Sequence, residues 1–132
     1  MPDPYFCKLY VDTDEEILEL QGLLKKLEFD IFNEFSIEII VYRNEDFKEM
    51  ARRLVPYSFI ECSRYYVEVG TLKEVPEYIL GFQSAVATLV SSLRSEKRFI
   101  TVSCDFEDII VNKTGWNWTR DTPEPPERTL CE

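Results

Sequence analysis

Four segments of the chain alternate apolar and polar residues with a period of two, which is typical of β-strands that bury one face. The clearest of them is 5–11, and the others cover 29–42, 59–69 and 98–106. The second is expected to divide near Asn33 into a short strand and a longer one. Each of these segments is therefore predicted to place its alternate residues against a common core.

Two further segments space their apolar residues by three and four, which is the pattern of an amphipathic helix. The first is predicted to begin near Thr13, which fits a capping box with Glu16, and to continue to about Leu27. The second covers 77–95 and follows a proline, a residue that suits a helix start. Within the polar segment between the second and third strands, 46–53 is expected to hold a short helical turn.

The predicted order of elements is β-α-β-β-α-β, the split βαβ arrangement of ferredoxin-like α+β domains. This arrangement has a four-stranded antiparallel sheet with both helices on one face, and right-handed crossovers place the first and third strands in the middle. We expect one domain over residues 1–112, with an irregular tail over 113–132 that contains both tryptophans and several prolines. The tail is expected to dock on the domain through Trp116 and Trp118.

The sheet face away from the helices is predicted to carry a set of aromatic side chains. These candidate partner-binding residues are Phe6, Tyr10, Tyr42, Tyr66 and Phe99. Because a large apolar area is seldom left in contact with water, the tail, a second copy of the chain or another protein should cover it. Stacking of RNA bases on these rings is disfavoured, because acidic residues share the surface and repel phosphates.

The formal net charge is −10, and the chain contains no histidine. The absence of histidine excludes Ser–His and Cys–His nucleophile pairs and imidazole zinc ligands, and no catalytic residue, metal site or cofactor is predicted. An acidic cluster of Asp105, Glu107 and Asp108 follows the fourth strand. Its spacing matches no calcium loop, so we interpret it as a solvated acidic edge that can attract a basic partner.

Four cysteines occur at positions 7, 62, 104 and 131, without the spacing of a disulfide scaffold or a zinc site. Buried thiols in a reducing cytoplasm are the simpler interpretation. The N-terminal residues lack the pattern of a secretory signal, and no apolar run is long enough to span a bilayer. We therefore expect a cytoplasmic protein.

Three segments together resemble small bacterial immunity proteins of polymorphic toxin systems. They are 4–12 (PYFCKLYVD), 104–108 (CDFED), and the tail from Gly115 through Glu124. The resemblance implies a cytoplasmic protein that neutralises a cognate toxin by stoichiometric binding.

The function expected from the sequence is that of a non-enzymatic acidic protein-binding module, namely an immunity protein. Its candidate contacts are the aromatic face together with the acidic cluster, its partner is a basic toxin domain, and neither nucleic acid nor membrane is bound. One alternative is a homo-oligomeric domain, such as a homodimer, that binds a small ligand or acts as an enzyme in a cavity between sheets. Another is a regulatory domain of a larger complex.

Overall fold

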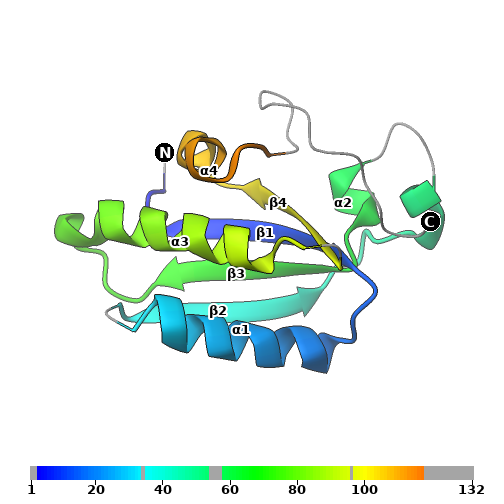
Figure 1. The fold of residues 1–132 in the computed structure, drawn as a ribbon, viewed down its shortest axis with the longest axis horizontal. Coiled ribbons are helices and arrows are strands. Elements are labelled where there is room, and N and C mark those ends of the chain that lie inside the picture. The colour runs from blue at the N-terminus through cyan, green and yellow to red at the C-terminus, as the bar shows by residue number, and fades with distance from the viewer. Residues whose placement is uncertain (1–2, 34, 54–57, 96, 118–132) are drawn as a thin grey trace.

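The computed structural model describes residues 3–33, 35–53, 58–95 and 97–117 (Figure 1). The elements follow one another as β1 (Phe6–Thr13), α1 (Ile17–Ile31), β2 (Ile37–Arg43), η1 (Glu49–Arg53), α2 (Phe59–Cys62), β3 (Tyr65–Thr71), η2 (Pro76–Tyr78), α3 (Ile79–Leu93), β4 (Arg98–Ser103) and α4 (Glu107–Thr114). The protein is α+β, as predicted.

The four strands form one sheet in the order β2-β3-β1-β4, and every neighbouring pair is antiparallel. The predicted placement of the first and third strands in the middle is confirmed. Leu9 of β1 lies opposite Val67 of β3 on one side and Val102 of β4 on the other, while Val41 of β2 lies opposite Val67. The odd-numbered residues of β1, β2 and β3 therefore share one face with the even-numbered residues of β4.

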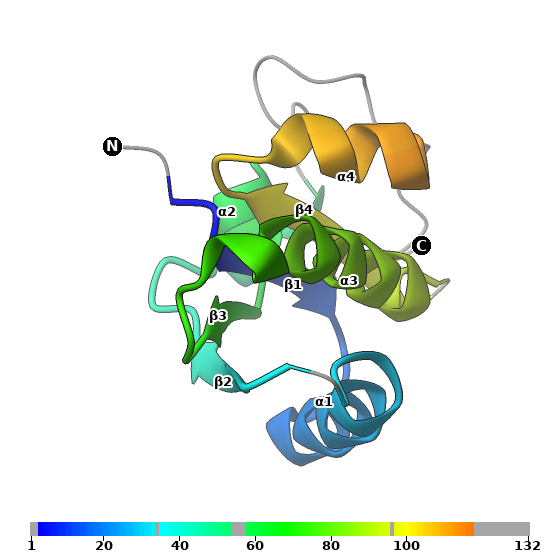
Figure 2. The same ribbon diagram turned by 90° about the vertical axis from the view of Figure 1, so that its left-hand side faces the viewer.

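That shared face is buried under the helices, so we call it the helix face. Leu20 and Leu24 of α1, Phe82 and Val86 of α3 and Ile110 of α4 join the strand side chains in one apolar core. Figure 2 shows α1, α3 and α4 side by side along the sheet, with α1 next to β2 and α4 next to β4. Both predicted helices thus pack on the same face.

Two predicted boundaries are wrong. Residues 59–62 form the short helix α2 rather than the start of the third strand, and 29–31 complete α1 rather than starting a strand. A run of four residues is too short for its apolar pattern to distinguish a strand from a helical turn. At 59–62 local hydrogen bonds stabilise the helical turn. Ser58 Oγ accepts from the N–H of Glu61, and the side-chain amide of Asn44 donates to the carbonyls of Ile60 and Ser63.

Two predicted features near the helix starts and the tail are also corrected. Thr13 belongs to β1, and its hydroxyl donates to the Lys97 carbonyl at 2.9 Å instead of capping α1. The fourth strand ends at Ser103, and α4 extends to Thr114, into the segment expected to be irregular. Gly115 then ends α4 with a φ of 97°, a left-handed conformation that glycine adopts without strain. Trp118 lies outside the described residues.

The segment after α4 closes the outer edge of β4. The Asn117 side chain accepts from the Val102 N–H at 2.8 Å and donates to the Val102 carbonyl at 2.9 Å, as a neighbouring strand would. Trp116 lies between Phe99, with ring centroids 4.9 Å apart, and the guanidinium of Arg94, which is 3.6 Å from the indole centroid. The predicted docking through Trp116 is therefore observed.

We expect Asn117→Ala to lower the free energy of unfolding by about 2–4 kcal/mol, because it leaves the buried N–H and C=O of Val102 without these partners. Urea denaturation followed by circular dichroism measures the change. Asn112→Ala, at an exposed position of α4, is the matched control and should change the value by less than about 0.5 kcal/mol. Equal stability of the two variants would contradict the role of Asn117 as the closure of this edge.

Candidate protein-binding surface

The sheet face opposite the helices, here called the reverse face, carries a row of aromatic rings. Tyr66 of β3 lies opposite both Tyr10 of β1 and Tyr42 of β2. The rings of Tyr42 and Tyr66 are stacked, with centroids 4.9 Å apart and planes 20° from parallel, and Tyr10 is 6.3 Å from Tyr66. The sheet register thus brings three of the five candidate aromatic residues into contact.

The side chain of Lys8 packs on two rings of this row. The ammonium of Lys8 lies 4.2 Å from the ring centroid of Tyr66 and 4.9 Å from that of Tyr10, which are cation–π distances. Lys8 is paired with Glu68 in the register, so a carboxylate neighbours the ammonium. Partial desolvation and the nearby Glu68 carboxylate raise the pKa of Tyr42, and this phenol therefore stays protonated.

The reverse face is only partly open, because two segments of the chain cover Tyr10 and Phe99. Phe59 of α2 packs edge-on against Tyr10, with centroids 5.3 Å apart, and Tyr10 is only 9% exposed. At the other covered position Trp116 lies on Phe99, which is also 9% exposed. Tyr10 and Phe99 therefore support the covering segments instead of facing solvent.

The open remainder of the reverse face, here called the tyrosine patch, contains exposed and half-buried side chains from three strands. Ile40 and Tyr42 are each 36% exposed, and Phe6 and Tyr66 are half-buried. The residues of the tyrosine patch are Phe6, Lys8, Glu38, Ile40, Tyr42, Tyr66 and Glu68. Of the predicted aromatic contacts, Phe6, Tyr42 and Tyr66 are available to a partner.

The acidic cluster lies at a different place, where β4 leads into α4. Asp105 accepts a hydrogen bond from the N–H of Asp3 at 2.6 Å. Glu107 is bound within the fold, since its carboxylate accepts from the Cys104 N–H and from the Asn117 side chain. Asp108 is exposed in the first turn of α4. Asp105 and Asp108 can contribute surface charge, whereas Glu107 holds the C-terminal segment in place.

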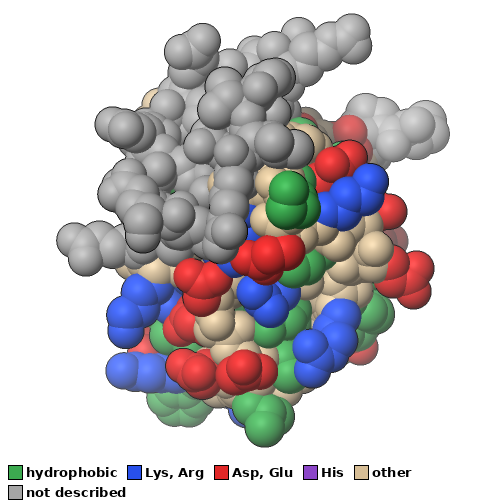
Figure 3. Space-filling model, turned by 90° about the vertical axis from the view of Figure 1, so that its right-hand side faces the viewer, with side chains coloured by type: hydrophobic (Ala, Val, Ile, Leu, Met, Phe, Trp, Pro, Cys, Tyr) green, Lys and Arg blue, Asp and Glu red, His purple; other side chains and the backbone are tan. Residues whose placement is uncertain are grey.

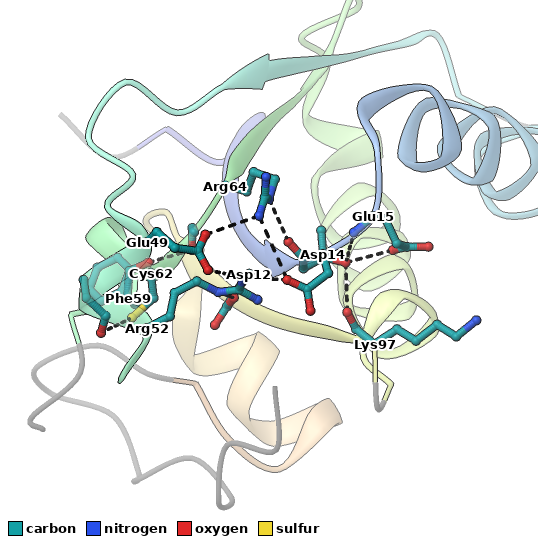
Figure 4. A network of polar contacts seen from close by, with 12 residues as sticks. Asp12, Asp14, Glu15, Glu49, Arg52, Phe59, Cys62, Arg64 and Lys97 are labelled. Atoms are coloured by element: carbon teal, nitrogen blue, oxygen red, sulfur yellow. Dashed lines mark hydrogen bonds and ion pairs between the residues drawn. The ribbon is translucent and has the colours of Figure 1, made fainter. Parts of the chain in front are cut away.

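A second charged cluster, which the sequence analysis did not single out, lies at the C-terminal end of β1 (Figure 4). The guanidinium of Arg52 is 1% exposed and donates from Nε to Asp12 at 3.1 Å. Its Nη1 lies 2.5 Å from Asp14 and 3.4 Å from Glu49, and Glu49 also pairs with Arg64 at 3.5 Å. The cluster joins the η1–α2 region to the sheet.

The buried cation of this cluster is compensated by a buried carboxylate, so we interpret the cluster as structural. A guanidinium taken out of water must be paired and hydrogen-bonded, and the carboxylate of Asp12, which is itself 1% exposed, meets that need. The signal in the sequence was Asp12 at the end of an apolar alternating strand. Its partner Arg52 lies 40 residues away, a pairing that no local pattern indicates.

The end of the molecule that carries this cluster shows charges of both signs. In Figure 3, acidic and basic side chains are interspersed over the described atoms of this side.

Among the described residues, Asp, Glu and Cys side chains form no group of three or more that could hold a metal ion. The described thiols of Cys7 and Cys62 are buried, and burial raises the pKa of Cys7.

No family model, no curated protein and no solved structure matches the chain. None of the helices in the described ranges is both long and apolar enough to cross a membrane.

We expect Arg52→Ala to lower the free energy of unfolding by about 3–5 kcal/mol, because it leaves the buried Asp12 carboxylate without its cation. The double variant Arg52→Met with Asp12→Asn removes both charges and should recover part of that loss. Chemical denaturation measures both, and Lys26→Ala, an exposed position of α1, serves as the control. A loss below about 1 kcal/mol in Arg52→Ala would contradict a structural role for the pair.

Proposed function

We propose that this protein is a non-enzymatic protein-binding module that docks a partner on the tyrosine patch, and that it acts as an immunity protein. In this role it neutralises a cognate toxin by stoichiometric binding. The observation that carries the proposal is the stacked and partly exposed pair of Tyr42 and Tyr66. The resemblance of the chain to immunity proteins of polymorphic toxin systems gives the class of partner.

The arrangement of the rings suits a binding surface. Tyrosine supplies a large contact area with few rotatable bonds, and it is enriched at protein interfaces and among the residues that dominate binding energy. Tyr42 and Tyr66 are already ordered by stacking on each other, and Tyr66 also by the ammonium of Lys8, so binding would cost little side-chain entropy. The phenol oxygen of Tyr42, which lies beside Glu68, can accept a hydrogen bond from a partner.

The charge of the chain supports a basic partner. With a net charge of −10 the protein attracts cationic domains over a distance of about 8 Å at physiological ionic strength. Glu38 and Glu68 lie within the tyrosine patch, and Asp105 and Asp108 lie beyond the end of β4. Association with a basic toxin would therefore be accelerated by electrostatic steering.

We further propose that the domain has the ferredoxin-like arrangement and resides in the cytoplasm. The strand order β2-β3-β1-β4, with antiparallel neighbours and α1 and α3 on one face, supports the first. The buried thiols of Cys7 and Cys62 are compatible with a reducing compartment and support the second.

The test begins with capture of a partner from the native cell and expression of that partner in a bacterial host. We expect the partner to arrest growth and co-expression of this protein to restore it. The double variant Tyr42→Ala and Tyr66→Ala should weaken binding at least about 100-fold by calorimetry and abolish rescue, because interface tyrosines contribute strongly. Leu80→Ala, at a 78% exposed position of α3, is the matched control and should rescue fully.

Two results would contradict the proposal. Unchanged affinity in the double tyrosine variant would exclude the tyrosine patch as the docking surface. A captured partner whose toxicity is not suppressed by co-expression would exclude the immunity role.

A further inference from the structure

The two outer edges of the sheet, at β2 and at β4, differ in their hydrogen bonding. Hydrogen bonds continue the ladder between β2 and β3 beyond both strand ends, from the Asn44 N–H to the Arg64 carbonyl and from the Leu72 N–H to the Ser36 carbonyl. In an antiparallel ladder bonded pairs alternate, so the even-numbered residues of β2 face β3. The backbone groups that face outward belong to Ile37, Ile39, Val41 and Arg43.

The outward-facing backbone N–H and C=O groups of β4 have hydrogen-bond partners, whereas those of β2 have none among the described residues. On β4 the side chain of Asn117 forms hydrogen bonds with both the N–H and the C=O of Val102. The side chain of Arg94 donates to the Ile100 carbonyl, and the backbones of Ser95 and Arg98 bond to each other. No hydrogen bond within the described ranges reaches the outer side of β2. Within the described residues, one edge is therefore closed, and a regular ladder of donors and acceptors is left on the other.

The sequence of β2 has few of the devices that usually protect an edge: its only charged residues are Glu38 and Arg43. It contains no proline, glycine or lysine, and its register against β3 runs one to one without a bulge. Its central residue Ile40 is 36% exposed on the reverse face. A regular strand of this kind, with apolar residues at its centre, is suited to pairing with another strand.

A groove of about 490 Å³ runs along this edge between β2 and α1. Leu18, Leu24, Ile39 and Val41 line it together with polar side chains and Gly22 of α1. Side chains of a strand added to β2 would alternate between this groove and the reverse face, because successive residues of a strand point to opposite faces. The groove can thus receive the apolar side chains of an added strand.

We propose that the occupant is β2 of a second copy of this chain, paired antiparallel about a two-fold axis at Ile40. In this register Ile39 pairs with Val41 and Ile37 pairs with Arg43 of the second copy. All outward N–H and C=O groups of the two strands then bond to each other. The result is a continuous eight-stranded sheet, and it joins the two copies by an isologous interface.

The register complements side chains on both faces. On the reverse face Ile40 meets its own copy at a non-hydrogen-bonded pair, where side chains lie closest, and Glu38 lies opposite Tyr42. On the helix face Ile39 and Val41 of the second copy enter the groove. Arg43 of the second copy comes to the Ile37 end of β2. There α1 ends with Glu28 on the groove and no basic residue in its last turn, while Lys25 lines the groove one turn earlier.

This inference goes beyond the proposed function and does not depend on it. The pairing leaves Tyr66 and Lys8 open and places the tyrosine patches of two copies side by side on one surface. Dimerisation is measured with the purified chain alone, whereas immunity is measured with a toxin, so either can fail without the other.

The first test is the mass in solution by light scattering or sedimentation equilibrium between about 1 and about 200 µM. The mass is expected to rise from 15.6 kDa toward twice that value as the concentration increases. Ile40→Lys places two ammonium groups face to face at the axis and should keep the chain monomeric throughout this range. Leu80→Lys, the matched control on α3, should dimerise as the native chain does.

A monomeric native chain at every concentration would overturn the inference, whether or not a partner protein uses the edge. A dimer that persists in Ile40→Lys would also overturn it, because the interface would then lie elsewhere.

The second test reports the register and uses a Cys131→Ser background. In an antiparallel non-hydrogen-bonded pair the Cα atoms are about 4.5 Å apart, within the range that a disulfide spans. Ile40→Cys should therefore form a disulfide-linked dimer on mild oxidation. Glu38→Cys lies about 14 Å from its own copy in this register and should remain reduced. Equal cross-linking of the two variants would overturn the register.

Discussion

The burial of a single face of the sheet is the constraint on which the other features depend. Leu9, Val67 and Val102 lie side by side across β1, β3 and β4, and all are fully buried beneath α1, α3 and α4. Because the side-chain period of a strand is two, this choice sends Lys8, Tyr66 and Thr101 to the reverse face. A slip of one residue would place aromatic and charged side chains in the core, so the register is strongly specified.

The reverse face is then divided by two segments that come from different parts of the chain. The η1–α2 region covers Tyr10 and is tied to β1 by the buried pair of Arg52 and Asp12. The segment after α4 covers Phe99 through Trp116 and closes the β4 edge through Asn117. Both covers lie toward the β1 and β4 side of the sheet, and the tyrosine patch remains on the β2 and β3 side.

The electrostatics of the protein differ between its interior and its surface. Inside, the guanidinium of Arg52 is paired with the carboxylate of Asp12, and this buried pair orders the fold without a long-range field. Outside, the excess of carboxylates acts at a distance and governs the rate of encounter with basic partners. The strand edge adds a directional interaction, since main-chain hydrogen bonds at β2 do not depend on net charge.

The alternating patterns of β1, β3 and β4 and the helical spacing in α1 and α3 were sufficient to predict the four-stranded antiparallel sheet, its central strands and the common face of the helices. These are local periodicities, and the burial of apolar side chains converts them directly into layers. They also selected Phe6, Tyr42 and Tyr66 as residues of the reverse face. The period alone did not separate α2 from a strand, because 59–62 is too short to distinguish the two patterns.

Contacts between distant residues decided the rest. The cover of Tyr10 by Phe59, the pairing of Arg52 with Asp12 and the closure of Val102 by Asn117 each join positions that no spacing rule connects. Which rings stay exposed, and which sheet edge stays open, depends on where those segments come to rest. The sequence by itself determined which residues lie on each face of the sheet, since that follows from the period of two. Only the tertiary structure decided which part of the reverse face remains accessible, because accessibility depends on what packs against it.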